Sequence, residues 1–457
     1  MVLLITPNTK KTNYDLTSME YSAFQPNIYM NLLESCYNHI KKIPCESIHM
    51  EGDMYSILDV LKHIERTLPD EVGIIASGSN PSASTMTMVG AIELCRAIKG
   101  TFPRQKVFIW GGHPTVMPER TLKETGADRV IIGDDFGVDP ALIPMVNWDK
   151  INPKKYKAHN WHCFGPDINN RSPYAVIWTT LGCPYQCEFC CINNVFEKRV
   201  YKMREMKDVI AEIDYLVKEH GIKHLKIMDE LFVSKNHKRI NEFCDALIER
   251  NYGLNMWCFA RTDTVNPEIL AKLKKAGVNW MALGFETVSQ KIITEIKKHS
   301  KVDEYEKVIG WIKDAGISII ADFIAGFWED DYESLEETYQ FMCKHNFEFI
   351  NLYPLFAYPG TPLFDKYKAK GIINEATSWE EYSLYGYHCK PCPTKHLTSA
   401  QLLQWRDDKY IEYYKRPEYL EMIENKFGKE TRDHVFGMAQ QHLVRRICME
   451  DKCLISV

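Results

Sequence analysis

Residues 180–191, with the sequence TLGCPYQCEFCC, constrain the fold and chemistry of this chain more than any other stretch. They place Cys183, Cys187 and Cys190 at C-x3-C-x2-C spacing in a loop that also holds glycine and proline. Thiolates favour zinc, copper(I) or iron–sulfur clusters, and a structural zinc site usually takes four ligands from two separated cysteine pairs. Three close thiolates can instead hold three irons of a cubane and leave the fourth open. A chance cysteine cluster in a turn is the alternative.

The composition is that of an ordinary globular protein with two or three domains. Of the 457 residues, 45% are hydrophobic and 26% are charged. The 56 basic and 61 acidic residues give a formal net charge of −5, so we expect no electrostatic attraction to a nucleic acid or to an anionic membrane. The sequence has no long apolar run and no basic leader, which predicts a cytoplasmic protein whose 15 cysteines stay reduced.

The first third of the chain alternates short apolar runs with helical patterns. Strands are predicted at residues 2–6, 72–76, 107–110 and 129–132, and helices at 28–40, at 89–98 and after Pro118. This alternation predicts a Rossmann-like domain, in which a parallel sheet carries helices on both faces. Glycine-rich loops at 77–85 and 111–115 follow two of the strands, at the edge where such sheets bind their ligands.

A second series of strands and helices begins near Tyr174. Six apolar segments predict strands, at residues 175–179, 224–228, 254–259, 280–284, 318–324 and 349–352. Six such units are what a partial (β/α)6 TIM-like barrel needs, and barrel sites lie at the carboxyl ends of the strands. The cysteine loop follows the first of these strands, so we expect it to open onto that face.

After Gly371 the sequence predicts a mainly helical cap, with helical patterns at 402–414 and 417–427. We therefore expect a Rossmann-like domain at 1–138, a linker at 139–172, the partial barrel at 173–371 and the cap at 372–457. The cap is where we expect substrate selectivity. Its cysteines are candidates for an auxiliary cluster or zinc, although we expect them to be packing thiols. They are Cys389, Cys392, Cys448 and Cys453.

The cysteine loop, with Phe189 just before the last cysteine and at the mouth of a six-unit barrel, resembles the radical SAM superfamily. The order of strands and glycine-rich loops upstream resembles the cobalamin-binding Rossmann-like domain that precedes the barrel in one subgroup. This resemblance implies that Cys183, Cys187 and Cys190 bind a [4Fe-4S] cluster and that S-adenosyl-L-methionine (SAM) chelates its fourth iron. Cys191 is expected to pack.

The resemblance also assigns strand-end residues to SAM. A carboxylate facing the ammonium group of SAM forms a charge-assisted pair, and a guanidinium can bind its carboxylate. The expected SAM-binding residues are Phe189, Asp229, Glu230, Arg261, Glu286 and Gly326. Taken singly, an acid or an arginine at a strand end is as often a solvated rim residue.

Small residues allow a backbone to approach the flat face of a corrin closely. The candidate cobalamin-binding residues are Ser82, Ser84, Thr85, Gly111, Gly112, His113 and Gly133. The sequence lacks the Asp-x-His-x-x-Gly motif that supplies a lower axial histidine, so a bound corrin would lack that ligand. A Rossmann-like layer without a cofactor is the alternative, and His113 alone is better interpreted as a loop histidine.

The resemblance predicts a radical SAM enzyme that forms a 5'-deoxyadenosyl radical. The leading hypothesis is a cobalamin-dependent methyltransferase acting on an unactivated carbon of a small metabolite, or of a sugar or natural-product intermediate. One alternative is a dehydratase, epimerase or rearrangement enzyme whose first domain is a scaffold or binds cobalamin non-catalytically. Another is a non-enzymatic iron–sulfur protein. The expected partners are a small-molecule substrate and a reducing electron donor such as flavodoxin or ferredoxin, with no nucleic acid and no membrane.

Overall fold

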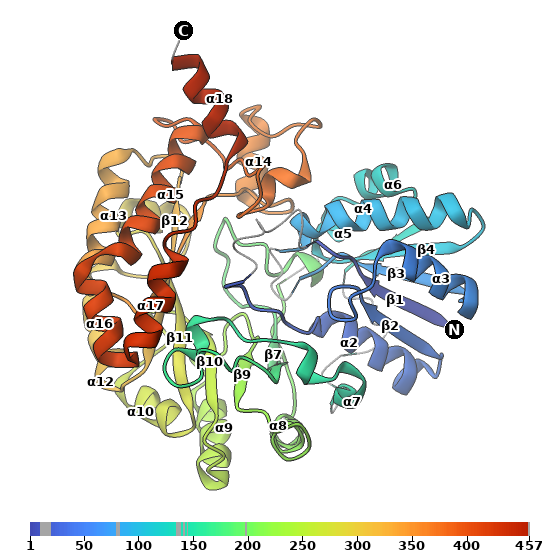
Figure 1. Cartoon of the computed structure of the whole chain (residues 1–457), viewed down its shortest axis with the longest axis horizontal. Helices are drawn as coiled ribbons and strands as arrows, with labels where there is room; N and C mark the ends of the chain where they lie inside the picture. Colours follow the sequence, from blue (N-terminus) through green and yellow to red (C-terminus); the bar gives the residue numbers. More distant parts are fainter. Residues whose placement is uncertain are drawn as a thin grey trace.

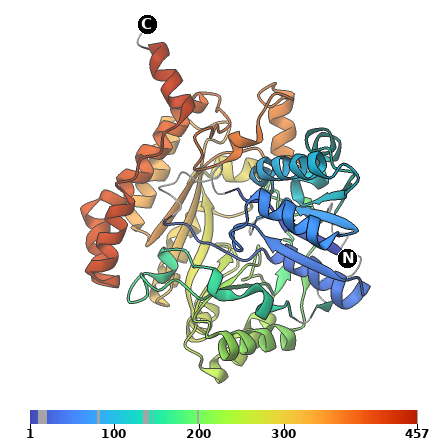
Figure 2. The same cartoon turned by 45° about the vertical axis from the view of Figure 1, so that its right-hand side comes forward.

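The computed structural model of the chain describes residues 1–9, 20–78, 83–133, 139, 142–143, 145–196 and 199–455. Figure 1 shows two α/β units side by side, the amino-terminal sheet on the right and the larger sheet of the middle segment in the centre. Helices of the carboxyl-terminal segment lie on the outer left side of the larger unit. Figure 2 brings the amino-terminal sheet forward.

The first unit is built on a five-stranded parallel sheet with strand order β2-β1-β3-β4-β5. Its strands are β1 (Val2–Thr6), β2 (Cys45–His49), β3 (Glu71–Ile75), β4 (Lys106–Trp110) and β5 (Arg129–Ile131). Every residue of β1 is buried, as expected for a strand covered on both faces. Sequence analysis missed β2, because this edge strand alternates only two buried residues with polar ones and so lacks an apolar run.

The helices of this unit are α2 (Ile28–Ser35), α3 (Ile57–Thr67), α4 (Ala83–Thr101), α5 (Gly112–Val116) and α6 (Pro118–Thr125). Helix α2 continues as a short π-helix, Cys36–Lys41. Asn27 caps α2, because its side-chain oxygen accepts a hydrogen bond from the amide of Met30 at 3.0 Å. Its side-chain amide donates to the carbonyl of Ser77 at 2.6 Å, which ties the start of α2 to the loop after β3.

The second unit is an open barrel of six parallel strands in the order β13-β12-β11-β10-β9-β6. Its strands are β6 (Tyr174–Ile177), β9 (His224–Ile227), β10 (Asn255–Ala260), β11 (Val278–Glu286), β12 (Ser318–Ala325) and β13 (Phe349–Pro354). Its helices are α8 (Met206–His220), α9 (His237–Arg250), α10 (Pro267–Lys275), α11 (Gln290–Glu295), α12 (Tyr305–Asp314) and α13 (Tyr332–His345). Each of the six predicted segments coincides with one of these strands to within a few residues at each end.

Connecting segments hold further short elements. Helix α7 (Trp148–Ile151) lies between the two units in sequence, and 3-10 turns occupy Pro153–Lys155, Trp161–Cys163, Asn194–Phe196, Val302–Glu304 and Trp379–Tyr382. Strands β7 (Thr180–Leu181) and β8 (Lys202–Met203) pair antiparallel on either side of the cysteine loop. This small ribbon fixes both ends of the loop beyond the carboxyl end of β6.

The carboxyl-terminal segment closes one open edge of the barrel. It contains α14 (Pro362–Ala369), α15 (Ser399–Lys415), α16 (Pro417–Phe427), α17 (Lys429–Met438) and α18 (Arg446–Ile455). The hydroxyl group of Tyr414 in α15 accepts from the amide of Ile350 at 3.0 Å and donates to its carbonyl at 2.9 Å. Arg406 donates to the carbonyl of Leu352. Helix α15 therefore satisfies backbone groups that edge strand β13 would otherwise leave unpaired.

The segment around Trp379 also joins the barrel to the first unit. The Trp379 ring meets the His113 ring edge-on at 4.4 Å between centroids, and the Arg120 guanidinium lies 3.8 Å from its ring centroid. Its indole nitrogen donates to Glu124 at 2.6 Å. The two units are thus packed together through aromatic and charged contacts.

The predicted fold class is confirmed: a Rossmann-like unit, a six-stranded partial barrel and a helical carboxyl-terminal segment. The predicted domain boundaries, at residues 138, 172 and 371, stay predictions. Within the part of the chain that the structure describes, no helix combines the length and the apolar composition needed to cross a bilayer.

We expect Gly111→Ala to destabilise the protein by at least about 3 kcal/mol, because the change combines backbone strain with a clash. Gly111 has φ +152°, and an added Cβ would lie 2.2 Å from the carbonyl oxygen of Ala76. Gly100→Ala is the matched control, because an added Cβ there has no heavy atom within 4 Å. Urea denaturation measures both, and equal midpoints for the two variants would contradict this account.

Candidate active site

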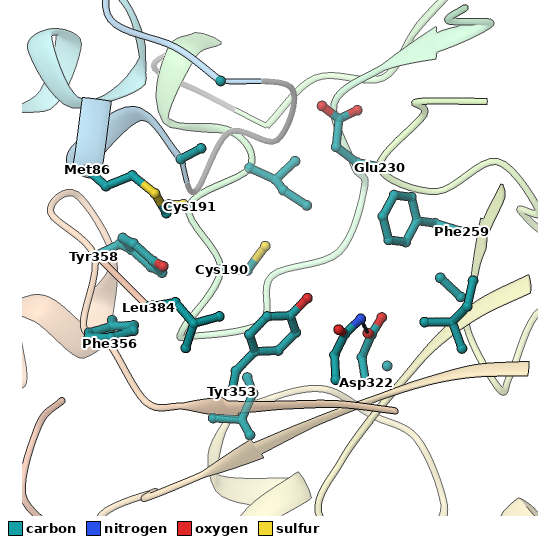
Figure 3. Close-up of a pocket in the computed structure, with 18 of the residues that line it drawn as sticks. Met86, Cys190, Cys191, Glu230, Phe259, Asp322, Tyr353, Phe356, Tyr358 and Leu384 are labelled. Carbon is teal, nitrogen blue, oxygen red and sulfur yellow. Dashed lines mark hydrogen bonds between the residues drawn. The ribbon is translucent and has the colours of Figure 1, made fainter. Parts of the chain in front are cut away.

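A cavity of about 1210 Å³ opens between the two units. It is lined by residues at the carboxyl ends of the barrel strands and of the first sheet, by the cysteine loop and by α15. Figure 3 looks into this space, with Cys190, Glu230, Asp322 and Tyr353 placed around it. Both parallel sheets thus present the edge at which such sheets bind ligands to the same space.

The three cysteines of the C-x3-C-x2-C motif, together with Cys191, line this cavity. Burial raises the pKa of the Cys183 thiol to about 11, and Cys187 and Glu230 add to this effect by their charge. Burial also raises the pKa of Cys190 well above its usual value. The loop therefore gathers thiols in a partly dry place where a positive metal centre would favour their thiolate forms.

Several contacts hold the cysteine loop in place. The side chain of Asn193 donates to the carbonyl of Cys183 at 2.9 Å and accepts from its amide at 3.3 Å. The amide of Glu188 donates to the carbonyl of Ile296 at 2.9 Å, and its buried carboxylate pairs with Lys297 at 2.7 Å and with Lys366. The loop is thus anchored to the barrel rim before any cofactor binds.

The described residues contain no group of three His, Cys, Asp or Glu side chains arranged to hold a single metal ion. A cubane asks for a different arrangement, because each thiolate ligates a different iron and the sulfurs need not meet at one point.

Asp229 and Glu230, the two acids after β9, differ in their relation to the cavity. Asp229 is fully buried and does not line the cavity; it accepts hydrogen bonds from the amide of Thr179 at 2.6 Å and from the hydroxyl of Thr180 at 2.8 Å. Glu230 does line the cavity, and accepts from the hydroxyl of Tyr29 at 3.1 Å and from the amide of Gly182 at 3.0 Å. Burial raises the pKa of Glu230 to about 7. Glu230 is thus the carboxylate placed to meet a ligand.

The Glu286 carboxylate pairs with a partner that the sequence analysis missed. Lys298, in the loop after α11, lies 2.5 Å from Glu286, and both side chains are buried and line the cavity. Gly284 leaves the room for this pair, because a Cβ there would lie 2.4 Å from a Glu286 oxygen and 2.8 Å from the Lys298 nitrogen. The loop position of Lys298 carries no sequence signal that could have identified it.

A second polar pair in the barrel was also missed. Asp322 on β12 and Asn351 on β13 are register partners, and the side-chain amide of Asn351 donates to Asp322 at 2.8 Å. Both line the cavity, and Gly284 is the register partner of Asp322 on the other side. Burial raises the pKa of Asp322 to about 7. An acid inside the apolar run 318–324 was the signal that could have revealed this site.

Phe189 and Gly326 differ in their relation to the cavity. Phe189 lines it and packs edge-on against Phe327, with 6.0 Å between ring centroids. Gly326 does not line the cavity. Its φ is +107°, and an added Cβ would lie 2.3 Å from the Leu402 side chain of α15, so this glycine allows the helix to approach β12 closely.

The candidate cobalamin-binding residues that the structure describes do not line the cavity. The Ser84 hydroxyl donates to the carbonyl of Ala76 and accepts from the amide of His113 at 2.9 Å. Gly133 accepts a hydrogen bond from the indole of Trp110 at 3.0 Å through its carbonyl. Within the described residues, those absent from the lining are Ser84, Thr85, Gly111, Gly112, His113 and Gly133. Ser82 lies outside the described residues.

His113 is almost completely buried beside Trp379 and Thr85. Burial lowers the pKa of its imidazole to about 3, so the ring is neutral. Its Nδ1 lies 3.2 Å from the hydroxyl of Thr85, and it contacts the residues that join the two units. His113 thus lies in α5 and not in a loop as expected, and its ring packs against Trp379 and Thr85.

Residues of the first unit other than these candidates line the cavity. They follow β1, β2 and β3 or begin α4, and are Thr6, Pro7, Thr9, His49, Glu51, Ser77, Gly78, Ala83, Met86 and Thr87. Most are small or polar, and Figure 3 shows Met86 on the same side of the space as Cys191. Ser77, Gly78 and Ala83 belong to the predicted glycine-rich loop at 77–85, whereas the predicted loop at 111–115 contributes no lining residue.

The cysteines of the carboxyl-terminal segment pack. Cys389 and Cys448 are buried in the hydrophobic cluster that joins the first unit to the cap, and Cys392 is buried in another. Burial raises the pKa of the Cys389 and Cys392 thiols to about 12. The side chain of Cys453 lies outside the described residues.

Parts of this chain are similar to known proteins. Residues 178–342 match the profile of the radical SAM superfamily. An uncharacterized methyltransferase of Pyrococcus horikoshii is 25% identical over 401 residues, which cover 79% of this chain and 82% of that protein. The anaerobic magnesium-protoporphyrin IX monomethyl ester cyclase of Rubrivivax gelatinosus is 29% identical over 308 residues, 66% of this chain and 53% of the cyclase.

A solved structure extends the likeness to almost the whole chain. The radical S-adenosylmethionine methyltransferase TsrM from Kitasatospora setae, solved with cobalamin and a [4Fe-4S] cluster bound, superposes with a TM-score of 0.66 at 13% identity. The alignment covers 91% of this chain and 89% of TsrM. Residues 178–342 therefore match the radical SAM superfamily, and the two units together share the fold of TsrM. The resemblance stated from the sequence is confirmed.

We expect Asp322→Asn to stabilise the folded protein at pH 8 but not near pH 4. The pKa of this carboxyl is about 3.9 in the unfolded chain and about 7 in the folded protein. The folded protein therefore becomes less stable as the pH increases across that range. Asparagine removes this cost, which is on the order of 2–4 kcal/mol above pH 7. Thermal unfolding at several pH values measures the difference. Asp245→Asn, at an exposed ion pair with Lys272, is the matched control; a pH-independent effect at Asp322 would contradict the expectation.

Proposed function

We propose that the protein is a cobalamin-dependent radical SAM methyltransferase that adds a methyl group to an unactivated carbon of a small molecule. One observation carries this proposal: the cysteine loop and the ligand-binding edge of the first sheet line the same cavity. A cavity of about 1210 Å³ has room for more than one ligand, since single-ligand pockets usually measure about 300–1,000 Å³. The methyltransferases among the similar proteins support the same reaction.

The side chains of the cysteine loop fit an iron–sulfur cluster. Cys183, Cys187 and Cys190 supply the thiolates, and no fourth cysteine ligand is needed if one iron stays open to SAM. Cys191 also lines the cavity, but it is buried at 7% exposure next to a ligand, and we keep packing as its role. We assign the three motif cysteines to the cluster.

The charges around the loop suit SAM, which carries an ammonium, a sulfonium and a carboxylate. Glu230 presents a half-buried carboxylate to the cavity and fits the ammonium group. The Glu286–Lys298 pair presents both signs and fits the polar parts of the cofactor, and the Phe189 ring offers an apolar face for the adenine. Asp229 would act through the backbone of residues 179–180, since its oxygens are already engaged there.

The first unit fits a corrin through residues other than those expected from sequence. Thr6, Pro7, Ser77, Gly78 and Ala83 line its side of the cavity with small groups, which suit close approach to a flat ring. No Asp-x-His-x-x-Gly motif is present, and His113 packs against Trp379. We therefore propose corrin binding without a histidine from this motif as the lower ligand.

When bound, the cluster supplies the electron that cleaves SAM to a 5'-deoxyadenosyl radical, and the corrin supplies a carrier for the methyl group. The chain orients the substrate and protects the radical. Tyr353, Phe356, Tyr358 and Leu384 form a largely apolar wall on one side of the cavity (Figure 3). Such a wall excludes water and other hydrogen donors from a reactive intermediate. The electron enters from a reducing protein, for which a flavodoxin or a ferredoxin is the proposed partner.

The cyclase relative favours a second candidate, in which the same radical starts a reaction without methyl transfer. Product mass separates the two when SAM carries a deuterated methyl group. A product heavier by one labelled methyl group supports methylation, and a product without the label supports the alternative.

Cys187→Ala should abolish both the broad charge-transfer absorption of the reconstituted protein and the formation of 5'-deoxyadenosine from SAM. The loss of one thiolate leaves an incomplete site in which the cluster is labile or absent. Cys343→Ala is the control, because this half-buried thiol in α13 lies outside the cavity lining. Anaerobic reconstitution followed by absorption and chromatography measures both signals. Activity retained in the Cys187 variant would exclude the assignment.

Ala83→Trp should abolish binding of hydroxocobalamin while the cluster still forms. An indole at the start of α4 fills the part of the cavity that we assign to the corrin, and Ala83 is not a cluster ligand. Glu93→Trp, at an exposed position of the same helix, is the matched control. Absorption spectra after gel filtration measure the bound corrin. A wild-type protein that never retains corrin would favour the second candidate function.

A further inference from the structure

Arg261 lies between the end of β10 and the cysteine loop, and only 7% of the residue is exposed. Its Nε donates to Asp263 at 2.8 Å, and a terminal nitrogen donates to the backbone carbonyl of Lys298. Its other terminal nitrogen donates to the sulfur of Cys187 at 3.8 Å. The guanidinium is therefore fixed by contacts on three sides.

The same guanidinium stacks on an aromatic residue of the cysteine loop. Its carbon lies 3.8 Å from the centroid of the Tyr185 ring, two residues before Cys187. Arg261 thus contacts the loop twice, once through a ring and once through a sulfur. These contacts differ from those of a rim arginine that waits for a ligand, because each edge of the planar group already has a partner on the chain.

Two cations that belong to ion pairs interact with the Cys187 thiol. One is Arg261, paired with Asp263, and the other is Lys298, paired with Glu286. Of the two cations, only Arg261 donates directly to the sulfur among the described contacts. An N–H group that donates to a cluster thiolate stabilises the more negative, reduced state more than the oxidised state, and hydrogen bonds to sulfur are among the factors that set cluster potentials.

We propose that Arg261 is a positioning residue that orients the Cys187 ligand and raises the reduction potential of the cluster. The inference rests on the proposed function, because it requires a cluster on the motif cysteines. It goes beyond the SAM contact expected for this residue from sequence. A low-potential electron donor would then reduce the cluster more readily, before SAM is cleaved.

Arg261→Gln should make the midpoint potential of the reconstituted cluster more negative in the absence of SAM. Loss of one charged hydrogen bond should lower the ratio of reduced to oxidised cluster about tenfold at a fixed potential, or about 59 mV for a one-electron couple. Arg261→Lys should shift it less, because lysine keeps the charge but cannot contact Asp263, Lys298 and Cys187 together. Dithionite titration followed by electron paramagnetic resonance measures the potential.

Asp263→Asn should shift the potential in the opposite direction. This variant removes the negative charge that balances Arg261 but keeps a side-chain oxygen that can accept from its Nε. A merely structural role for the arginine would not give shifts of opposite sign. Arg250→Gln, which breaks an ion pair with Asp214 on the outer helices, is the matched control and should leave the potential unchanged.

Iron and sulfide content and circular dichroism are measured on every variant, so that a folding defect is recognised. A variant with full iron content and an unchanged potential overturns the proposal, as do shifts of the same sign in the Arg261→Gln and Asp263→Asn proteins. Weaker SAM binding in Arg261→Gln with an unchanged potential would assign the residue to the SAM carboxylate instead. Failure of the wild-type protein to form a cluster would refute the proposed function itself.

Discussion

The arrangement of the molecule depends on one property of parallel sheets, namely that all strands end at the same edge. The first sheet contributes residues at or after the ends of β1, β2 and β3 to the cavity, and the barrel contributes residues from β9, β10, β11, β12 and β13. Because the two edges face each other, side chains distant in sequence meet in one space. Tyr29 and Glu230, which are 201 positions apart, are joined by a hydrogen bond of 3.1 Å across the boundary between the units. The aromatic contacts of Trp379 keep that boundary closed.

The barrel interior holds ionisable groups that would be costly to bury alone. Glu286 is paired with Lys298, and Arg261 with Asp263, so each charge has a partner within hydrogen-bonding distance. Glu230 and Asp322 are only partly compensated, and burial raises the pKa of each to about 7. Such buried acids lower the stability of the protein without its ligands, but they offer hydrogen-bond acceptors to a ligand. A bound cation would therefore compensate the negative charges that the chain itself leaves only partly paired.

The sequence predicted the barrel well because six buried strands of a parallel sheet leave uninterrupted apolar runs. It also predicted the cysteine loop, because three cysteines so close in sequence must lie close together in the folded chain. Edge strand β2 was missed because a half-exposed strand keeps only part of its apolar pattern. The sequence could not predict in which direction a side chain points. Asp229 and Glu230 are neighbours, yet only Glu230 lines the cavity. The position of Lys298 in a loop and the register of Asn351 on β13 leave no pattern in the sequence. In the glycine-rich loops, Ser84 and Gly111 both pack closely against the carbonyl of Ala76.

Helix α15 links the stability of the barrel to the shape of its cavity. Tyr414 satisfies the amide and carbonyl of Ile350 on edge strand β13, and Arg406 binds the carbonyl of Leu352 on the same strand. The same two residues, with Tyr410 between them, line the cavity. A substitution that enlarges the cavity at this helix therefore also exposes a sheet edge, which carries a cost in stability. Changes of substrate can arise more freely from cavity residues without backbone contacts to β13, such as Leu384 in the preceding segment. The carboxyl-terminal segment thus lines the cavity with one helix that is constrained by β13 and with one loop residue, Leu384, that is less constrained.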